Sequence, residues 1–577
     1  MAETRYAPRP VPHTLTGVHP VLSRVYAARQ VDSPEQLRLD LARLAPPDGL
    51  PDLDRAVGRL QVALENGEKI LFVGDYDADG ATAVALGVST LRAFGVADVD
   101  YVVPNRFAFG YGLSPGIVDF AASVQPRLLV TVDNGIASID GVARARELGI
   151  DVIITDHHLP GAERPDACAV VNPVLPESTF PSRALAGVGV IFYVLSRLRA
   201  RLTESGWFAR RGITPPNMAD ALDLVALGTV ADVVPLDHNN RILVRQGLAR
   251  MRASRCRPGV RALIEVAKRD RARLTAADLG FALGPRLNAA GRLDDMTIGI
   301  RCLLATDDAE ARHLAVALDQ LNVARRELEQ VMVADAELIV ADQLAAGIQR
   351  DGVCVYDPTW HQGVVGIVAG RLKDRLHRPV IAFAEAGNSA PDELKGSARS
   401  IEGLHMRDML DEIATTHPGL LPRFGGHAMA AGLSLKRVHF KQFASAFDRK
   451  VRERLPEDLR AHVLHTDGEL TADELSLTLA EQLAEGGPWG QGFPAPLFEG
   501  TFDVVSQRVV GEAHLKLTLA IPLGGGDRRR LLDAIAFRQP PLANGSRQVR
   551  MAYRLERNDW GDVPTLQLQV EHLTPLP

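Results

Sequence analysis

The chain has 577 residues, of which 46% are hydrophobic and 24% charged, so it has the composition of a globular protein that is too long for a single core. Its formal net charge of −6 argues against a protein that coats nucleic acid through overall basicity, although a local basic groove can coexist with an acidic site. The four cysteines lie far apart, and neither an N-terminal apolar region nor a run of eighteen apolar residues occurs. We therefore expect two to four domains in a reduced, cytoplasmic protein that does not enter a membrane.

The first fifty residues are rich in proline and polar side chains. We expect them to form an extension that lies on the first domain, with one helix near residues 33–44. Alternating apolar and helical segments begin after residue 50, which marks the start of that domain.

Three short apolar runs, each followed by acidic residues, alternate with segments of mostly helical composition along residues 69–158. Such alternation predicts a parallel sheet covered by helices on both faces, with polar loops gathered at the carboxyl edge of the strands. A further apolar stretch, residues 222–230, is interpreted as a fourth strand end. The acids and histidines that follow these four stretches are Asp75, Asp77, Asp79, Asp133, Asp156, His157, His158 and Asp232.

So many carboxylates at one edge would repel one another strongly if they were ionised and no cation were present. Divalent cations remove this repulsion, and carboxylates with imidazole but no thiolate suit Mn²⁺ or Mg²⁺ better than a structural Zn²⁺. Because the ligands exceed the needs of one ion, we expect two divalent ions. Ions roughly 3.5 to 4 Å apart would clamp the attacking and leaving oxygens of a displacement at phosphorus.

Two other interpretations of these segments were weighed against a metal site. Aspartates after strands often cap helices, and each segment taken alone fits a cap or a solvated turn. Acid at four strand ends, one of them with paired histidines, favours the metal site. A phosphate-binding P-loop requires Gly-Lys-Ser/Thr after its second glycine, whereas Ala81 and Thr82 follow Gly80, so the P-loop is excluded.

Four short motifs in this order resemble those of the DHH phosphoesterases and, in detail, those of the RecJ-type single-stranded-DNA-specific exonucleases. They are Gly-Asp-Tyr-Asp-Ala-Asp-Gly (74–80), Val-Asp-Asn-Gly (132–135), Asp-His-His (156–158) and Thr-Val-Ala-Asp-Val-Val-Pro-Leu (229–236). The resemblance implies an α/β fold with a parallel-sheet DHH domain, a second α/β DHH-associated domain joined by a long helix, and a C-terminal OB-fold β-barrel. The expected order is an N-terminal extension (1–50), the DHH domain (51–305), the connecting helix (306–346), the DHH-associated domain (347–455) and the OB-fold domain (456–577).

The resemblance also suggests a role for each residue of the acidic edge. Asp133 is expected to bridge the two ions, and Asp156 to orient a histidine. His158 is expected to face the scissile phosphate, where it stabilises charge or protonates the leaving oxygen. The expected metal ligands are Asp75, Asp77, Asp79, Asp133, His157 and Asp232.

Two arginines outside this edge are expected to contact DNA phosphates. Arg106 lies in the glycine-rich, aromatic loop of residues 104–112, and the resemblance places it near the 5′ end of a bound strand. Without the resemblance, a solvated loop arginine would be the preferred interpretation. Arg286 belongs to residues 284–292, which match a RecJ signature and are expected to break a helical region.

Residues 306–346 have the composition of one long helix, with Thr306 as the expected N-cap. Its apolar residues are spaced 4, 3, 7, 3 and 7 apart, close to a heptad repeat, so a coiled-coil dimer is one interpretation. A bridging helix about 60 Å long between two lobes is preferred, and a monomer is expected.

A second α/β unit with several glycine-rich segments follows the long helix. Two of these segments, residues 396–400 and 424–432, match the DHH-associated domain. The resemblance implies that Ser397 and Arg399 grip a phosphate and that His427 faces the cleft. A hydrogen-bonded histidine in a glycine-packed turn is the alternative for His427.

The last part of the chain changes to strand periodicity. Residues 514–521, 531–537, 549–555 and 566–573 alternate apolar and polar side chains, which predicts a small antiparallel barrel. A basic barrel suits an OB-fold that tracks a nucleic-acid backbone, although solvated strand faces are also often basic. The arginines of this region are Arg508, Arg528, Arg529, Arg530, Arg538, Arg547, Arg550, Arg554 and Arg557.

The sequence thus predicts an enzyme that degrades single-stranded DNA from the 5′ end to mononucleotides in DNA repair and recombination. Single-stranded DNA, a single-strand-binding protein and a repair helicase are the expected partners. A DHH phosphodiesterase of small substrates is the first alternative, and the extra barrel and long helix argue against it. An inactive replication scaffold is the second, and the complete set of acids and histidines argues against it.

Overall fold

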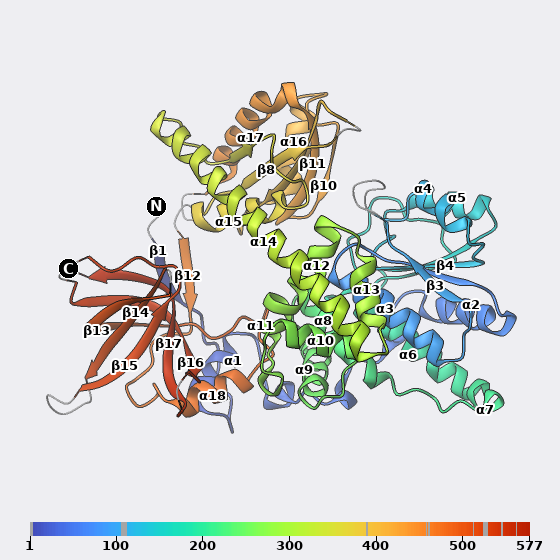
Figure 1. The fold of residues 1–577 in the computed structure, drawn as a ribbon, viewed down its shortest axis with the longest axis horizontal. Coiled ribbons are helices and arrows are strands. Elements are labelled where there is room, and N and C mark those ends of the chain that lie inside the picture. Colours follow the sequence, from blue (N-terminus) through green and yellow to red (C-terminus); the bar gives the residue numbers. More distant parts are fainter. Residues whose placement is uncertain are drawn as a thin grey trace. The chain divides into compact units, whose positions relative to one another are not determined.

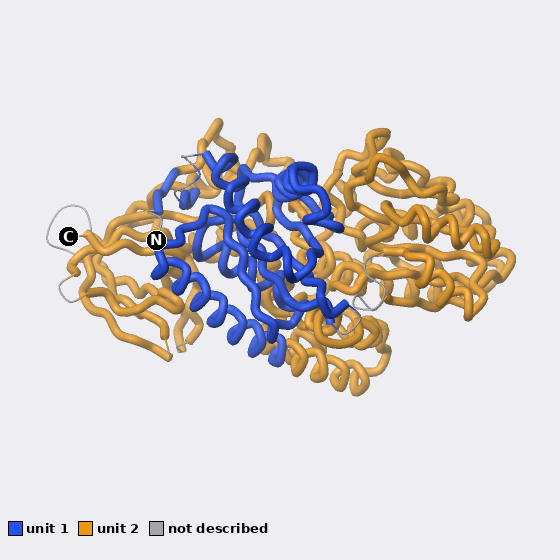
Figure 2. Tube along the Cα trace, turned by 90° about the horizontal axis from the view of Figure 1, so that it is seen from above, with its two compact units in different colours: residues 1–7, 323–465 blue, residues 8–322, 466–577 orange. Residues whose placement is uncertain are grey.

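The computed structural model describes residues 4–104, 112–387, 390–456, 459, 462–511, 513–522, 529–543, 546–560 and 562–576. The chain forms two compact units, residues 1–7 with 323–465 and residues 8–322 with 466–577 (Figure 2). The larger unit therefore contains both the first α/β domain and the C-terminal barrel, and the smaller unit is inserted between them in sequence. Among the described residues, no helix has the length and apolar composition needed to cross a membrane.

The first α/β domain is built on a five-stranded parallel sheet with the strand order β3-β2-β4-β5-β6. Successive side chains of one strand enter different cores, as the period of two requires: Ile70 and Phe72 face one layer, and Leu71 and Val73 face the other. Both faces are covered by helices, which confirms the predicted arrangement (Figure 1). The strands are β2 (Ile70–Val73), β3 (Val99–Val102), β4 (Leu128–Val132), β5 (Asp151–Thr155) and β6 (Ala169–Val171).

The helices of this domain form two groups. Helices α4 (Pro115–Ala122) and α5 (Ile139–Glu147) pack together on one face, and α3 (Ala78–Ala93) packs with α6 (Gly187–Glu204) and α8 (Leu222–Ala231) on the other. The remaining helices are α1 (Pro20–Ala27), α2 (Leu53–Asn66), α7 (Trp207–Arg211), α9 (His238–Arg252), α10 (Pro258–Val266), α11 (Ala276–Asp278), α12 (Gly284–Leu293) and α13 (Thr297–Leu304). Short turns of helix lie at η1 (Pro34–Leu37), η2 (Leu41–Arg43), η3 (Pro47–Gly49), η4 (Met218–Ala221), η5 (Arg271–Arg273) and the π-helical η6 (Leu279–Leu283).

Three predictions of local structure were wrong. The fourth apolar stretch is helix α8 and not a strand, because a helix buried on all sides is as uniformly apolar as a buried strand. Residues 284–292 lie within helix α12, where the glycines allow close packing and do not break the helix. The helix expected near residues 33–44 is replaced by the short turns η1 and η2.

Helix α14 (Asp308–Ala345) confirms the long helix. Its N-terminus is capped by Asp307, whose Oδ1 accepts hydrogen bonds from the backbone N–H groups of Ala309 (3.0 Å) and Glu310 (2.9 Å), and not by Thr306. The apolar seam is buried at Leu318 but exposed at Val331 and Leu338. Because the helix passes from the larger unit into the smaller one at residue 323, the two halves of the seam meet different surroundings.

The smaller unit contains a five-stranded sheet with the order β10-β11-β9-β8-β7, in which only β7 and β8 are parallel neighbours. Its strands are β7 (Val353–Tyr356), β8 (Val380–Glu385), β9 (Glu393–Arg399), β10 (Arg423–Gly426) and β11 (Ala430–Lys436). Its helices after α14 are α15 (Val365–Leu376), α16 (Met406–Thr416), the short η7 (Arg437–His439) and α17 (Phe440–Arg454). A separate two-stranded sheet pairs β1 (Thr4–Pro8) with β12 (His462–Thr466).

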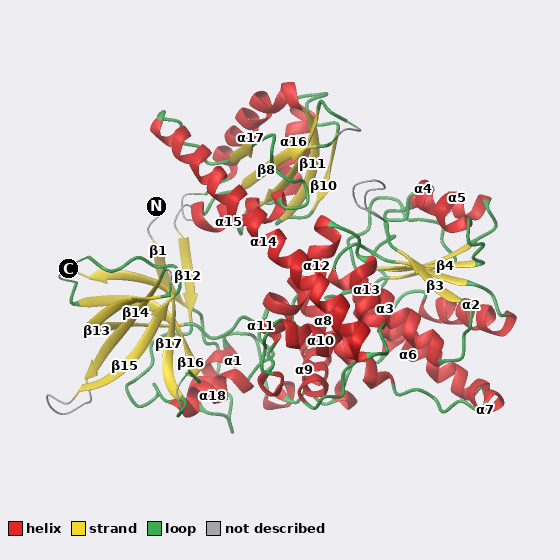
Figure 3. Cartoon of the chain, in the orientation of Figure 1, coloured by secondary structure: helices red, strands yellow, loops and turns green. Residues whose placement is uncertain are grey.

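The C-terminal part of the larger unit is a closed barrel with the strand order β13-β14-β15-β17-β16, and α18 (Leu477–Glu485) lies beside it (Figure 3). This closed five-stranded barrel confirms the predicted OB-fold, but β15 and β17 pair in parallel, so the expectation of a wholly antiparallel barrel was wrong. Strand β13 was missed by the sequence analysis because a bulge between Val504 and Ser506 breaks its alternation. The strands are β13 (Phe498–Val510), β14 (His514–Pro522), β15 (Arg529–Ala536), β16 (Gln548–Asn558) and β17 (Thr565–Leu576).

The N-terminal helix α1 joins the barrel to the first domain. Val21 and Val25 lie in the barrel core, whereas Tyr26 lies in the core of the first domain. Arg29, just after the helix, forms a two-point ion pair with Asp467 (2.7 and 2.9 Å), and each side chain is only 1% exposed. Residues 20–29 of the N-terminal extension therefore contact both the barrel and the first domain, whereas the sequence predicted contact with the first domain alone.

Replacing Arg29 with alanine should lower the free energy of unfolding by about 3–5 kcal/mol, because Asp467 would stay buried without its main cationic partner. Urea denaturation followed by tryptophan fluorescence measures this loss. Arg144→Ala is the matched control, since it removes an exposed pair with Asp119 (2.7 Å) and should hardly move the midpoint. Equally small effects of the two substitutions would contradict the joining role of Arg29.

Candidate metal centre

The acidic loop after β2 is held by the start of helix α3. Asp77 is the N-cap residue, and its Oδ1 accepts hydrogen bonds from the N–H groups of Asp79 and Gly80, both at 3.0 Å. Gly80 is required here because a β-carbon would lie 2.7 Å from the backbone nitrogen of Asp75. The capping role of Asp77, weighed as an alternative from sequence, is therefore present, and it fixes the loop that carries the other acids.

Asp79 lies at the junction of two helices. It belongs to the first turn of α3 and accepts hydrogen bonds from the N–H groups of Gly187 (2.6 Å) and Val188 (2.9 Å), which begin helix α6. Burial and the neighbouring Asp77 raise the pKa of Asp79 to about 7, although the two N–H donors oppose this shift. A cation bound here would favour the ionised form of this carboxylate and so oppose the shift.

Asp133 follows β4 in a left-handed backbone conformation with φ of 63°. Helix α6 comes so close that a β-carbon on Gly187 would lie 2.5 Å from the β-carbon of Asp133. Burial, followed by the charges of Asp79, Asp77, Asp232 and Asp75, raises the pKa of Asp133 well above its usual range. The approach of the helix thus crowds the carboxylates into one buried group.

The histidine pair after β5 is fixed by Asp156. One carboxylate oxygen of Asp156 accepts from the N–H groups of His157 (2.7 Å) and His158 (3.1 Å) and lies 2.7 Å from Nδ1 of His158, while the other accepts from the N–H of Ile136 (2.8 Å). Burial alone would raise the pKa of Asp156, but these hydrogen bonds lower it. Burial alone would lower the pKa of His158, but Asp156 and the nearby carboxylates raise it. The contact between Nδ1 of His158 and Asp156 therefore sets the orientation of the His158 ring.

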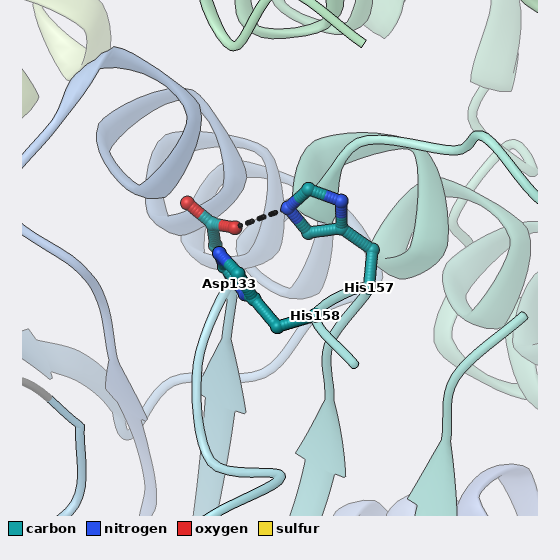
Figure 4. A group of neighbouring side chains, drawn as sticks. All are labelled: Asp133, His157 and His158. Atoms are coloured by element: carbon teal, nitrogen blue, oxygen red, sulfur yellow. Dashed lines mark ion pairs between the residues drawn. The ribbon is translucent and has the colours of Figure 1, made fainter. Parts of the chain in front are cut away.

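His157 is the side chain around which the carboxylates gather. Its Nε2 lies 3.0 Å from Oδ1 of Asp133, 3.5 Å from Oδ2 of Asp232 and 4.0 Å from Oδ2 of Asp79 (Figure 4 shows the pair with Asp133). Asp232 reaches this place from the C-cap of α8, where burial and the other acids raise its pKa well above the usual range. The helix therefore supplies the carboxylate that the sequence analysis had assigned to a strand end.

Ligand atoms in this cluster are close enough to share metal ions. Three groups each have all their ligand atoms within 4.8 Å of one another: Asp133 with His157 and His158, Asp79 with His157 and Asp232, and Asp75 with Asp77 and Asp133. Buried carboxylates with raised pKa values are costly to ionise without a cation, so the residues fit divalent ions. The oxygen-rich donor set with imidazole suits Mn²⁺ or Mg²⁺.

Helix α12 supports the acidic loop. Oδ1 of Asn288 accepts a hydrogen bond from the N–H of Ala78 (2.8 Å), and a β-carbon on Gly291 would lie 1.8 Å from the carbonyl oxygen of Tyr76. Arg286 of the same helix pairs with Asp319 of α14 (2.8 Å), and its side chain is 11% exposed. Arg286 thus links α12 to α14 through this ion pair. Its expected contact with a DNA phosphate stays a prediction.

Sequence analysis missed several residues that position this site. Asn134 donates from Nδ2 to the carbonyls of Val73 (3.0 Å) and Val132 (2.9 Å) and so ties the ends of β2 and β4 together. Gly228 of α8 permits close contact, since a β-carbon there would lie 2.9 Å from Oδ1 of Asp79. The only signal for these residues and for Asn288 was their place in or beside the motifs, and Gly187, which lies far from every motif, had none.

The other expected phosphate ligands belong to segments that are described separately from this cluster. Arg106 is outside the described residues. Ser397 and Arg399 lie on β9 of the smaller unit, where Nη1 of Arg399 donates to Oγ of Ser397 (3.0 Å) and to the carbonyl of Ala398 (2.8 Å). His427 is exposed in the hairpin between β10 and β11, and its backbone N–H donates to the carbonyl of Ala430 (2.8 Å).

Comparison with known proteins agrees with this site. Residues 69–229 match the N-terminal domain of the DHH family, residues 350–453 match the DHHA1 domain, and residues 466–572 match the RecJ OB domain. The sheet, its acidic edge and the first of these matches define the class as DHH proteins.

Relatives of nearly equal length specify the family within this class. The chain is 54% identical over 563 residues to the single-stranded-DNA-specific exonuclease RecJ of Dickeya dadantii (strain 3937), and 52% identical over 562 residues to that of Salmonella typhimurium, with 96% of each chain covered in both cases. The crystal structure of RecJ in complex with Mn²⁺ from Thermus thermophilus has a TM-score of 0.79 at 31% identity, covering 100% of this chain and 80% of that chain. Its counterpart in complex with Mg²⁺ has a TM-score of 0.74 at 30% identity, covering 100% and 78%. The chain therefore belongs to the RecJ family.

The close approach of α6 gives a test of the site. Gly187→Ala should push the N-terminus of α6 away from Asp79 and Asp133 and weaken Mn²⁺ binding roughly ten- to a hundredfold, as loss of a supporting contact does at other metal sites. Isothermal titration calorimetry measures the affinity. Gly58→Ala in α2 is the matched control, because the nearest atom to its β-carbon is 3.9 Å away. Unchanged Mn²⁺ affinity in Gly187→Ala would show that the α6 N-terminus does not position the ligands.

Proposed function

We propose that this chain is a metal-dependent exonuclease that hydrolyses single-stranded DNA and starts at the 5′ end. The observation that carries the proposal is the complete cluster of buried carboxylates and paired histidines at one edge of the parallel sheet. Relatives named as single-stranded-DNA-specific exonucleases, at more than half identity over nearly the whole chain, support the substrate. The 5′ start, the release of mononucleotides and the role in repair and recombination rest on the family resemblance alone.

The proposed cofactors are two divalent ions, Mn²⁺ or Mg²⁺. When bound, such ions lower the pKa of water to give a nucleophile and polarise the phosphoryl oxygens. Asp133 and His157 each belong to two of the three ligand groups, and Asp133 is proposed as the shared ligand because a carboxylate has two oxygens with which to bridge two ions. The proposed ligands are Asp75, Asp77, Asp79, Asp133, His157 and Asp232.

His158 is proposed to act on the phosphate directly. Its Nδ1 lies 2.7 Å from Oδ1 of Asp156, which leaves Nε2 as the ring nitrogen available to the phosphate. Burial would lower the pKa of His158, but Asp156 and the nearby carboxylates raise it, which favours a ring that stabilises negative charge or protonates the leaving oxygen. Asp156 contributes by holding this orientation.

Asp133→Asn should reduce hydrolysis of single-stranded DNA to below a few per cent of wild type and leave strand binding mostly intact. Asparagine is chosen because it tolerates the positive φ of 63° better than alanine does. The substitution should not destabilise the metal-free protein, because it removes a buried ionisable group from a set of mutually repulsive carboxylates. Activity is measured with end-labelled strands at saturating Mn²⁺, and substantial remaining activity would contradict the shared-ligand assignment.

The rival functions predict different results in the same assay. A phosphodiesterase of small substrates would cut dinucleotides but not long strands, and an inactive scaffold would bind strands without cutting them in Mn²⁺. The proposed enzyme should degrade long single strands, require the divalent ion and leave blunt duplexes intact. Cleavage of blunt duplex at a comparable rate would contradict the strand preference.

A second proposal concerns the 5′ end of the strand. Arg399 is largely enclosed, burial lowers its pKa, and among the described residues no carboxylate forms an ion pair with it. Gly366, in the first turn of α15, is so close that a β-carbon would lie 2.9 Å from both the Arg399 guanidinium and Oγ of Ser397. An enclosed cation beside a hydroxyl and a helix N-terminus suits an anion such as a terminal phosphate. Arg106 and His427 are proposed as further ligands of the DNA from the resemblance alone.

Arg399→Ala should slow degradation of 5′-phosphorylated strands roughly ten- to a hundredfold, since a charge-assisted contact contributes about 1.5–3 kcal/mol. Strands with a 5′ hydroxyl should be affected little, so that the preference between the two disappears. Both rates are measured at one fixed salt concentration, because phosphate contacts weaken together as salt rises. Arg449→Ala, at an exposed position of α17, is the control, and equal losses on both substrates would contradict the pocket.

We propose that the barrel binds the DNA strand through fewer arginines than the nine named in the sequence analysis. Four of its arginines already pair with carboxylates, and Arg530 donates to the carbonyl of Leu475. The four paired arginines are Arg529, Arg550, Arg554 and Arg557. The basic character predicted from composition is therefore partly neutralised, and Arg508, Arg538 and Arg547 are the better candidates for phosphate contacts.

Further proposals rest on the resemblance and the composition. We propose that the protein acts as a monomer in the cytoplasm, and the free state of its four cysteines supports that compartment. A single-strand-binding protein and a repair helicase are the proposed partners. The domain boundaries at residues 50, 305, 346 and 455 are likewise proposals. Sedimentation of the purified protein with and without each partner tests the monomeric state and the choice of partners.

A further inference from the structure

An exposed phenylalanine lies on an unusual turn close to the metal centre. Phe281 occupies the middle of the π-helical turn η6, and 85% of its surface is exposed. Its neighbours Leu279, Ala282 and Leu283 are buried. Single π-helical turns occur frequently at functional sites, and a fully presented aromatic ring gains nothing for the fold itself. The turn therefore presents this ring to solvent while its other face remains packed.

The packed face of the turn lies against the end of α8. A β-carbon on Gly280 would lie 3.2 Å from the Val230 side chain, and one on Gly284 would lie 3.1 Å from the β-carbon of Ala231. The next residue is Asp232, whose carboxylate lies 3.5 Å from His157. The turn that carries Phe281 therefore packs against Val230 and Ala231, and Ala231 directly precedes the proposed metal ligand Asp232 in the sequence.

Helix α12, which follows the π-helical turn directly, leads from Phe281 to the acidic loop. Asn288 of α12 lies at that loop, where its Oδ1 accepts a hydrogen bond from the N–H of Ala78. An α-helical rise of 1.5 Å over the seven residues from Phe281 to Asn288 gives a separation along the axis of at most roughly 10 Å, because a π-helical turn is wider and rises less per residue. A strand whose phosphate lies at the acidic loop can therefore reach the ring with a neighbouring base.

We infer that Phe281 stacks on an unpaired base of the strand held at the metal centre, an inference that rests on the proposed function. Every base has a π-face, so this contact is independent of sequence, as required of a nuclease that removes one nucleotide after another. A paired base keeps its faces within the duplex stack, so the same ring favours single strands over duplex. Val233, the residue after Asp232, is a second exposed apolar side chain next to the proposed metal ligands in the sequence.

The test uses an Asp133→Asn background, in which strands bind without being cut. Phe281→Ala should weaken binding of single strands about five- to tenfold, at the lower end of the range for base stacking on an aromatic ring. It should also remove the fluorescence quenching of a 2-aminopurine base placed near the cleaved end. Phe281→Trp should retain both properties, whereas Phe281→Leu, which keeps an apolar side chain of similar size, should retain neither.

The matched control is Phe120→Ala, which removes another exposed aromatic ring, 60% exposed on α4, and should leave binding and quenching unchanged. Unchanged strand affinity in Phe281→Ala, with 2-aminopurine still quenched, would overturn the inference. Full rescue by Phe281→Leu would also overturn it, since the contact would then not depend on an aromatic face. A wild-type protein that fails to cut any single strand would instead refute the proposed function, and circular dichroism confirms that each variant is folded.

Discussion

The repulsion among carboxylates at one edge of the parallel sheet is the constraint on which the rest of the structure depends. Asp79, Asp133 and Asp232 all have raised pKa values because they are buried together. The fold opposes part of this cost by directing the N–H groups of two helix N-termini at the acids: α3 binds Asp77, and α6 binds Asp79. Bound divalent cations offset the remaining repulsion among the carboxylates. The N–H groups keep these acids in the geometry that the ions require before the ions bind.

Close helix packing follows from the same constraint. The carboxylates can converge only if α6, α8 and α12 approach the strand ends, and each helix has a glycine at its point of contact: Gly187, Gly228 and Gly291. Any side chain at these positions would separate the helix from Asp133, Asp79 or Tyr76. These three glycines therefore act by permitting contact, whereas Gly135, with φ of 115°, is also required for its backbone conformation.

The strand ends of the site could be predicted from the sequence, and the helices that complete it could not. Apolar runs followed by Asp75, Asp133 and Asp156 specify a parallel sheet with an acidic edge, because few other folds place acids in that way. A uniformly apolar stretch such as residues 222–230 carries no period, so α8 was mistaken for a strand. The support given by Asn288 and Gly291 was also missed, since it depends on contacts with Ala78 and Tyr76, more than 200 residues away along the chain. Arg286 shows a related limit: its charge was visible in the sequence, but its partner Asp319 was not.

The barrel and the metal centre are held in one compact unit although the smaller unit separates them in sequence. Trp489 and Phe493 stack at 5.1 Å, and the guanidinium of Arg241, from a helix of the first domain, lies 4.2 Å from the Phe493 ring. The backbone N–H of Leu236, four residues after Asp232, donates to the carbonyl of Gln491 (2.7 Å) in the segment that leads to the barrel. Because this segment is anchored four residues from a proposed metal ligand, the barrel and the acidic edge are fixed relative to each other within the larger unit. A strand that contacts both would therefore pass from the barrel surface to the acids over a set distance, whichever nucleotide lies at the metal centre.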